Sequence, residues 1–470
     1  MESIPRKSLS IAVLSLAVFP VFSQSKPNVV FIMTDQQSYN MMSCTGNKWL
    51  KTPNMDKIAQ MGTRFDNTYC ANPLCMPSRF SLLTGHHSSE VGEKTNARNF
   101  DKEKVKQILA RDALGIIFQK AGYETLYSGK THLYGTKDLS EYGFHLNDLN
   151  PYDGPAIYAE AVLSEKGKTK QDKPFFLFLS FLNPHDICYG AGKDQRFPDK
   201  LPPENVTETQ RWLDFQKTMS PEEYHRQIPP KPANAAPISD EPKDMYSIVA
   251  RNTWDDNQWD LYRWMYCRLT ESVDAQIGRV LTALEKSGLM GNTIIVFTSD
   301  HGEMGGSHGY VTKNVMFEEC QRVPLIFAGK GIKSNNVDRS TLVCNGLDFI
   351  PTLCDLTGVV CSKNLTGISL KYCLKGEGKI PDRKYIITED ANAFQIHDGR
   401  YKFTILELPG NPEMLTDIKS DPGETVNLAK DPAFVKIKSK LKKILMDDLS
   451  KSGLLPLVEN RTHSLIKKST

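Results

Sequence analysis

The stretch "PNVVFIMTDQQ", from Pro27 to Gln37, is a short apolar run that ends in polar residues. An uninterrupted apolar run of this length is typical of a parallel strand covered by helices. We therefore predict a strand over Val29–Met33 that is buried on both faces, with Asp35 just past its carboxyl end. The same design recurs in "PFFLFLSFLNPHD" (Pro174–Asp186), "NTIIVFTSDHGE" (Asn292–Glu303) and "VPLIFAG" (Val323–Gly329).

Helical periodicity separates these predicted strands. Between Leu261 and Leu284, apolar residues recur at spacings of three and four, which gives one apolar stripe along a long helix that Gly288 ends. Alternating strands and helices predict an α/β fold: a large, mostly parallel mixed sheet sandwiched by helices. In such sheets the carboxyl ends of the strands are the expected place for a functional site.

The chain divides into segments of different composition. Residues 1–23 place Arg6 and Lys7 before an apolar run, which is the layout of an export signal peptide. We expect a main domain over 24–379 and a smaller C-terminal α+β subdomain over 380–470, where an alternating strand precedes an amphipathic helix. Within the main domain, 186–255 is rich in proline and is either a variable insertion or lid near the site, or a disordered surface loop.

Composition limits the partners and the location of the protein. The 470 residues carry a net charge of +3, which is too even a balance to indicate nucleic acid as a partner. Outside the signal peptide no stretch approaches about 18 uninterrupted apolar residues, so we expect no membrane segment in the mature chain. The signal predicts an exported protein, in a bacterial periplasm or, alternatively, secreted.

Four of the predicted strand ends or nearby loops carry polar residues. These are Asp35 and Gln36, then Lys130 and His132 after "YETLYSG", then His185, and finally Asp300 and His301. A single Asp or His at a strand end is usually a cap, but four such ends of one sheet converge in space. Asp35, Gln36 and Asp300 offer hard oxygen atoms that suit Ca²⁺ or Mg²⁺ rather than zinc, and His301 adds an imidazole.

Cations are expected near the same edge of the sheet. Arg79, Lys130 and Lys313 could hold an oxyanion there together with a metal ion. His132 and His185 could move protons near neutral pH. Each lysine, taken alone, is more simply explained as a solvated surface charge.

The stretch "NPLCMPSRFSLLTG", from Asn72 to Gly85, places Cys75 two residues before a proline. A buried thiol or half of a disulfide, the two ordinary roles of a cysteine, needs none of these neighbours. The run Cys75-Met76-Pro77-Ser78-Arg79, followed by Leu82, Thr84 and Gly85, resembles the signature of the type I, formylglycine-dependent sulfatases of the alkaline phosphatase superfamily. The stretches "NVVFIMTDQQ", "SGKTHL", "NPHD" and "TSDHGEMGGSHGYVTKNVMFEECQRVPLIF" resemble further landmarks of that family, so the resemblance spans almost the whole mature chain.

The resemblance implies an alkaline-phosphatase-like fold and a sulfuric ester hydrolase, with 24–379 as its catalytic domain. It implies that a formylglycine-generating maturation enzyme reads this motif and oxidises Cys75 to Cα-formylglycine (3-oxoalanine) before folding. One oxygen of the hydrated aldehyde would attack sulfur and displace an alcohol, and the other hydroxyl would let sulfate leave and restore the aldehyde. Export and the habits of the family suggest a sulfated carbohydrate as substrate.

The resemblance also assigns roles to residues of this chain. The ligands of Ca²⁺, with Mg²⁺ possible, would be Asp35, Gln36, the modified Cys75, Asp300 and His301. Catalysis would fall to Cys75, Arg79, Lys130, His132, His185 and Lys313, and substrate binding to Lys130, His185, His308 and Lys313. Ser78 would help to position the modified residue. Gln36 departs from the family, because many members have a second aspartate there, so one negative charge is missing.

Two other functions stay open at this point. A phosphonate or phosphate ester hydrolase of the same superfamily can share the cysteine motif. An inactive, exported glycan-binding protein is the other alternative, and the intact set of Cys75, Arg79, Lys130, His132 and Lys313 argues against it.

Overall fold

A computed structural model describes residues 26–135, 138–147, 150–168, 173–190, 203–243, 245, 253–375 and 383–454, so the predicted signal peptide 1–23 lies outside the described residues. Eight strands of the described chain form one sheet in the order β5-β4-β6-β1-β7-β8-β2-β9. They are β1 (Asn28–Asp35), β2 (Gly62–Phe65), β4 (Glu124–Gly129), β5 (His145–Asn147), β6 (Phe175–Pro184), β7 (Thr293–Ser299), β8 (Leu325–Gly329) and β9 (Asn336–Asp338). Strand β8 runs antiparallel to both of its neighbours and the other pairs are parallel, which confirms the predicted mostly parallel mixed sheet.

Strand β1 lies at the centre of this sheet, between β6 and β7. Successive side chains of a strand point to opposite faces. Val29, Phe31 and Met33 accordingly join the apolar core on one side of the sheet, and Val30 and Ile32 join the core on the other. Every residue of β1 is buried, which is why its sequence shows no polar face.

Helices cover both faces of the sheet, as predicted. One face is covered by α2 (Cys75–Thr84), α3 (Lys102–Asp112), α4 (Leu114–Lys120) and α11 (Asn345–Thr357), and the other by α1 (Pro53–Gln60), α5 (Gly154–Lys168) and α9 (Asp256–Lys286). The long helix α9 contains the predicted apolar stripe and begins at a capping box formed by Asp255 and Gln258. It ends just before Gly288, whose φ of 71° lies in the left-handed region that favours glycine.

The C-terminal part of the chain is a small antiparallel sheet with one helix against it. Its strands are β11 (Ile386–Asp390), β12 (Ala393–His397), β13 (Tyr401–Leu406) and β14 (Glu413–Asp417), in that order. Leu441, Leu445 and Leu449 of α13 (Val435–Lys451) complete its core. The predicted α+β character is therefore confirmed, while a domain boundary at 380 falls outside the described residues and stays a prediction.

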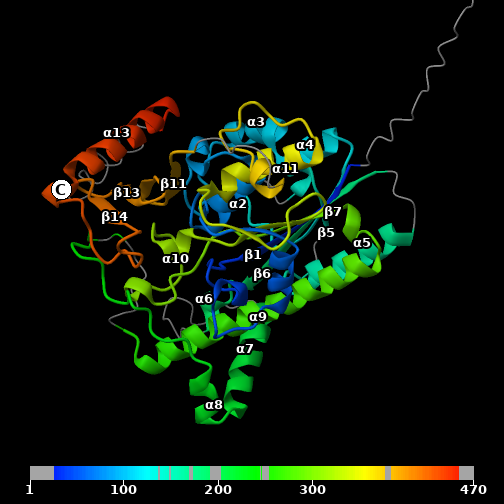
Figure 1. Cartoon of the computed structure of the whole chain (residues 1–470), viewed down its shortest axis with the longest axis horizontal. Coiled ribbons are helices and arrows are strands. Elements are labelled where there is room, and N and C mark those ends of the chain that lie inside the picture. Colours follow the sequence, from blue (N-terminus) through cyan, green and yellow to red (C-terminus); the bar gives the residue numbers. More distant parts are fainter. Residues whose placement is uncertain are drawn as a thin grey trace, which may run out of the picture.

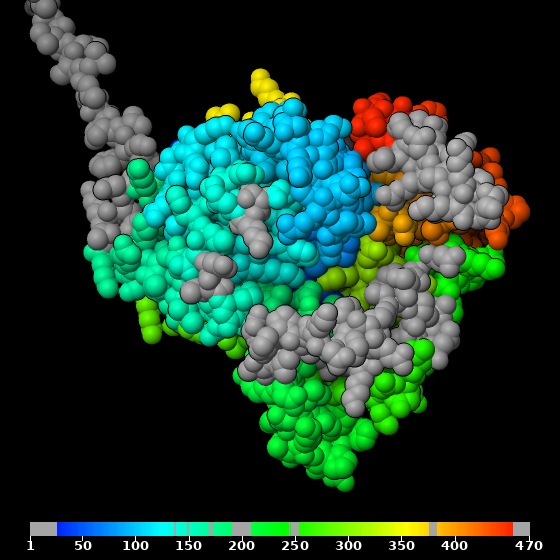
Figure 2. Space-filling model, turned by 180° about the vertical axis from the view of Figure 1, so that it is seen from behind, coloured from blue at the N-terminus to red at the C-terminus, as the bar shows by residue number. Residues whose placement is uncertain are grey.

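The proline-rich segment 186–255 contains α6 (Ile187–Gly190), α7 (Pro203–Thr218) and α8 (Pro221–Arg226). Helices α7 and α8 project below α9 in Figure 1, and Figure 2 shows the same green lobe standing out from the body. The chain then returns to α9, where the Nε of Arg263 donates to the carbonyl of Pro229 at 2.9 Å, and Ile228 and Ile238 are buried. The return from α8 to α9 is therefore packed against the rest of the fold at these residues. Whether segment 186–255 moves as a lid stays a prediction.

The remaining elements of the described chain are short. They are the paired strands β3 (Thr68–Tyr69) and β10 (Val343–Cys344), the helices α10 (Glu318–Gln321) and α12 (Lys371–Lys375), and a few single 3₁₀ turns. Across the described ranges, no helix combines the length and the apolar character that a membrane span requires.

Candidate active site

The carboxyl ends of four neighbouring strands, β4, β6, β1 and β7, lie side by side at one edge of the sheet. Lys130 follows β4, His185 follows β6, Asp35 ends β1 and Asp300 follows β7. These strands are parallel to one another, so the order of the sheet brings together residues that are up to 265 positions apart, such as Asp35 and Asp300. The polar strand ends converge as the sequence pattern predicts.

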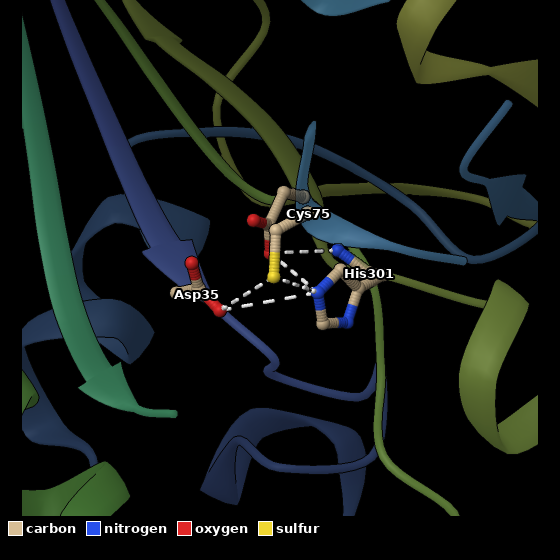
Figure 3. A group of neighbouring side chains, drawn as sticks. Asp35, Cys75 and His301 are labelled. Carbon is tan, nitrogen blue, oxygen red and sulfur yellow. Dashed lines mark hydrogen bonds and ion pairs between the residues drawn. The ribbon is translucent and has the colours of Figure 1, made fainter. Parts of the chain in front are cut away.

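Cys75 is the first residue of α2, a helix that is buried along its whole length. The Cys75 Sγ lies 3.2 Å from Nε2 of His301, 3.1 Å from Nζ of Lys313 and 3.8 Å from Oδ1 of Asp35. Figure 3 shows the side chains of Asp35, Cys75 and His301 turned toward one another at the end of β1. Cys75 is a free thiol in this structure and is only 1% exposed.

The environment of Cys75 favours negative charge at its side chain. Burial alone would raise the pKa of the Cys75 thiol, but the ammonium groups of Lys130 and Lys313 and the imidazole of His301 lower that pKa well below its usual value. A helix N-terminus adds a positive partial charge at the same place. The position of Cys75 therefore suits an anionic or oxygen-rich group.

Four side chains at this position could hold a metal ion. One ligand atom each from Asp35, Cys75, Asp300 and His301 lies within 4.8 Å of the others, and all four residues are buried. Burial and the nearby Asp35 carboxylate raise the pKa of Asp300, so a cation between the two carboxylates would relieve their repulsion. Two buried carboxylates with an imidazole, and the Gln36 amide beside them, fit a cation that prefers oxygen ligands.

Arg79, one turn after Cys75 on α2, holds the two carboxylates in place. Its Nη2 lies 2.8 Å from Asp35 Oδ2 and its Nε lies 2.9 Å from Asp300 Oδ2. Its Nη1 donates to the Lys130 carbonyl at 2.9 Å and to the Ser180 hydroxyl at 2.8 Å. Burial would raise the pKa of Asp35, yet the charges of Lys130 and Arg79 keep it below its usual range.

Ser78 completes the contacts of α2 with the end of β7. Its hydroxyl donates to the backbone carbonyl of Asp300 at 2.5 Å. The Asp300 side chain in turn accepts from the backbone N–H of Gln36 at 3.0 Å and from that of His301 at 2.9 Å. The start of α2 and the ends of β1 and β7 are thus tied into one unit.

The other predicted catalytic residues form a partly exposed rim around the buried cluster. These are Lys130, His132, His185 and Lys313. His132 helps to lower the pKa of the Cys75 thiol, and the Cys75 thiol acts in turn on the pKa of His185, so both imidazoles lie close to Cys75. Burial and the charges of Lys130 and Lys313 lower the pKa of His185 to about 3, so its imidazole is neutral at neutral pH. The exposed rim marks the side from which a substrate would reach Cys75.

His308 has a different environment from the rim residues. Its ring stacks on Phe317 with a centroid distance of 3.9 Å, and its backbone N–H donates to the carbonyl of Asn234 at 2.6 Å. Burial lowers the pKa of the His308 imidazole. The role of His308 in substrate binding stays a prediction.

The sequence patterns did not single out three residues that contact this site. Ser180 binds Arg79, while Cys188 and Glu303 both contact the side-chain amide of Gln36. Glu303 stands three residues after Asp300, so its place in the same loop was a usable signal. Nothing local in the sequence distinguishes Ser180, inside an apolar strand, or Cys188, one of ten cysteines.

The family of the chain follows from comparison with known proteins. The model of the family described as "Sulfatase" matches residues 27–359. The chain belongs to the sulfatase family. A second family model, described as "N-sulphoglucosamine sulphohydrolase, C-terminal", matches residues 306–451 of this sulfatase.

Individual relatives agree with this result. The sulfatase is 31% identical to a Δ4,5-hexuronate-2-O-sulfatase of Bacteroides thetaiotaomicron over 92% of its own chain and 90% of the relative. It is also 31% identical to an N-acetylglucosamine-6-O-sulfatase of the same bacterium, over 79% of its own chain and 76% of the relative. A solved structure of a 2-O GAG sulfatase superposes with a TM-score of 0.75 at 29% identity and covers 91% of this chain and 93% of that one.

Membership of the family makes the chain a hydrolase and implies a metal ion and a formylglycine residue. The buried group of Asp35, Cys75, Asp300 and His301 offers this sulfatase a place for both. The alkaline-phosphatase-like architecture expected from the sequence agrees with the structural match.

Proposed function

We propose that this sulfatase hydrolyses sulfate esters of carbohydrates, using a formylglycine derived from Cys75 and a bound Ca²⁺ ion, and releases inorganic sulfate. The observation that carries the proposal is the position of Cys75, at the start of a buried helix and in contact with His301, Lys313 and Asp35. The carbohydrate part is supported by relatives that are named for sulfated sugars, a hexuronate in one case and N-acetylglucosamine in the other.

Two groups beyond the encoded side chains supply the central chemistry. The hydrated aldehyde would supply an oxygen nucleophile. A Ca²⁺ ion would supply positive charge beside it, and its ligands would be Asp35, Gln36, the modified Cys75, Asp300 and His301. Mg²⁺ suits the same oxygen donors. Arg79 keeps the Asp35 and Asp300 carboxylates oriented toward this ion through its two ion pairs.

The rim residues handle the sulfate group and the protons. Lys130 and Lys313 place two ammonium groups beside residue 75, where they hold the anionic sulfate and stabilise charge as the ester bond breaks. His132, which lies close enough to residue 75 to lower the pKa of its thiol, takes the proton of the attacking oxygen. Burial and the lysine charges lower the pKa of His185. Binding of an anionic sulfate opposes the effect of the lysines and so prepares His185 to protonate the leaving oxygen.

The proposal extends to maturation, location and domain roles. A formylglycine-generating enzyme would modify Cys75 in the signature before folding, and residues 1–23 would direct export to a bacterial periplasm. Residues 24–379 would act as the catalytic domain, with 380–470 as its C-terminal subdomain. The signature residues Cys75, Met76, Pro77, Ser78 and Arg79 are all buried, which supports modification ahead of folding.

Desulfation of defined sulfated mono- and disaccharides tests this function. The matured protein would be incubated with hexuronate 2-O-sulfates and N-acetylglucosamine 6-sulfate, and free sulfate would be measured by ion chromatography. We expect sulfate release from at least one sugar and none from a Cys75→Ala control. Turnover of an aryl phosphonate without release of sulfate from any ester would favour the phosphonate hydrolase instead. A thiol at position 75 in protein from the native host, with no turnover, would favour an inactive glycan-binding protein.

A further inference from the structure

Glu303, in the loop after β7, is a buried carboxylate whose two oxygens have separate partners. It is 2% exposed. Its Oε1 accepts hydrogen bonds from the Tyr262 hydroxyl at 2.5 Å, from the Thr312 N–H at 2.6 Å and from the Gly305 N–H at 3.2 Å. Its Oε2 accepts from Nε2 of Gln36 at 2.5 Å. The first oxygen is therefore committed to fixed donors, and the second meets the Gln36 amide.

The Gln36 side chain is bound on both sides of its amide. While Nε2 donates to Glu303, Oε1 accepts from Nζ of Lys313 at 2.5 Å. The Sγ of Cys188 lies 3.1 Å from Nε2 and 3.3 Å from Oε1, so it does not select an orientation. A reversed amide would set its NH₂ against the Lys313 ammonium and its oxygen against the Glu303 carboxylate, which are two repulsive contacts.

The backbone of Gln36 is fixed as well. Its φ of 68° is unusual for a residue with a side chain. Its N–H donates to Asp300 Oδ1 at 3.0 Å, and its carbonyl accepts from the Tyr266 hydroxyl at 2.7 Å. The rotation of the amide is therefore the main freedom left at this residue, and Glu303 faces it directly.

We propose that Glu303 is a positioning residue that turns the carbonyl oxygen of Gln36 toward the cation site, the side on which Nζ of Lys313 contacts both that oxygen and the Cys75 Sγ. This inference rests on the proposed function, in which Gln36 is a Ca²⁺ ligand. An aspartate at position 36 would bring a negative charge to the site itself. In this chain the negative charge is on Glu303 instead, which contacts the Gln36 amide and fixes its orientation. Partners of this kind orient metal ligands and are about as important as some of the ligands themselves.

Glu303→Gln should reverse the Gln36 amide. The carbonyl oxygen of the introduced glutamine must stay with the N–H groups of Thr312 and Gly305, because its own NH₂ cannot accept from them. The NH₂ of the glutamine at position 303 then faces Gln36. The Gln36 amide turns over, so that its oxygen accepts from this NH₂ and its own NH₂ points toward the cation site. We expect the dissociation constant for Ca²⁺ to rise about 10–100-fold.

Combining this change with Gln36→Glu should restore the site. In the double variant the NH₂ of the glutamine at position 303 donates to one oxygen of the glutamate at position 36, and the other oxygen of that glutamate faces Lys313 and the cation. The number of charges is unchanged and both residues keep their size. If Glu303 only stabilised its loop, the double variant would bind Ca²⁺ no better than Glu303→Gln alone.

Glu319→Gln is the matched control. Glu319 accepts from a side-chain amide, that of Asn234, at 2.8 Å, and burial raises its pKa, as burial does for Glu303. Both glutamates line the same cavity of about 530 Å³, so an effect transmitted through that cavity would appear in both variants. Glu319 does not belong to the group of candidate ligands in the described chain.

The test is calorimetric titration of CaCl₂ into the full-length, matured protein after removal of metal with EDTA, with circular dichroism as a check of folding. We expect weaker binding for Glu303→Gln, recovery to within about threefold of wild type for the double variant, and wild-type binding for Glu319→Gln. Unchanged binding by Glu303→Gln, or no recovery in the double variant, would overturn the role of Glu303 but leave the proposed function standing. A wild-type protein that binds no Ca²⁺ would overturn the calcium site as well. If Glu303→Gln does not fold, the double variant decides: near wild-type affinity supports the pairing, and failure to fold or bind refutes it.

Discussion

Replacing Arg79 by methionine removes the cation that separates two buried carboxylates. Arg79 is 1% exposed and pairs with Asp35 at 2.8 Å and with Asp300 at 2.9 Å. In this variant Asp35 still forms its ion pair with Nζ of Lys130 at 2.6 Å, whereas Oδ2 of Asp300 loses its ion pair with Arg79. Breaking one buried pair costs about 3–5 kcal/mol, because an uncompensated charge stays behind. We therefore expect Arg79→Met to lower the free energy of unfolding by about 3–5 kcal/mol, the cost of one broken pair, and not by twice that amount.

Calcium should reduce this loss. A divalent cation between the carboxylates supplies the missing positive charge, so the variant gains more from Ca²⁺ than the wild type does. We expect the difference in unfolding free energy to shrink by at least about 1.4 kcal/mol, which is a tenfold change in the equilibrium constant. Urea unfolding followed by tryptophan fluorescence, in EDTA and in CaCl₂, measures both quantities on protein produced without the maturation enzyme, so that residue 75 is a thiol throughout.

Arg279→Met is the control for loss of an arginine ion pair. Arg279 contacts both oxygens of Glu160, at 2.9 and 2.7 Å, but the two side chains are 36% and 42% exposed. An exposed pair is worth less than about 1 kcal/mol and should show no dependence on Ca²⁺. A loss for Arg79→Met as small as this control, or one that is the same with and without Ca²⁺, would refute the assignment of Asp35 and Asp300 to a cation site.

Three further outcomes are expected. Cys75→Ala should abolish sulfate release while leaving the circular dichroism spectrum unchanged, and residual activity near wild type would contradict the role of Cys75. Lys313→Ala should lower kcat/KM about 10²–10³-fold, because one fixed cation at the sulfate is lost, and steady-state kinetics showing unchanged kcat and KM would remove Lys313 from the site. In unmatured protein the pKa of the folded Cys75 thiol lies well below the value of 9.0 that we take for the unfolded chain. At a pH between these two values the unfolded chain binds one more proton than the folded protein, so the free energy of unfolding should rise with pH up to about 9. Urea unfolding at pH 6 and pH 8.5, compared with Cys75→Ser, checks the sign, and a difference that does not grow with pH would contradict a thiolate.

The strands that carry the site are predictable because each is a buried apolar run with polar residues at its end. Asp35 and Asp300 could therefore be placed together from the sequence alone. The direction of β8 could not, because an apolar run carries no information on strand direction. The contact between Gln36 and Glu303 joins residues 267 positions apart through hydrogen bonds that local patterns do not encode.

Under the proposed function, Cys75 must be oxidised before α2 is enclosed, because Cys75 is only 1% exposed in the folded protein. Helix α2 cannot be enclosed before Asp300 exists to bind Arg79, and that residue is synthesised roughly 220 positions later, about 10–45 s at ordinary rates of synthesis. The proposed maturation enzyme and the folding reaction would thus compete for each chain. A chain that folded first would bury an unmodified Cys75 and stay inactive, and a mutation that slows folding would raise the fraction of molecules that mature.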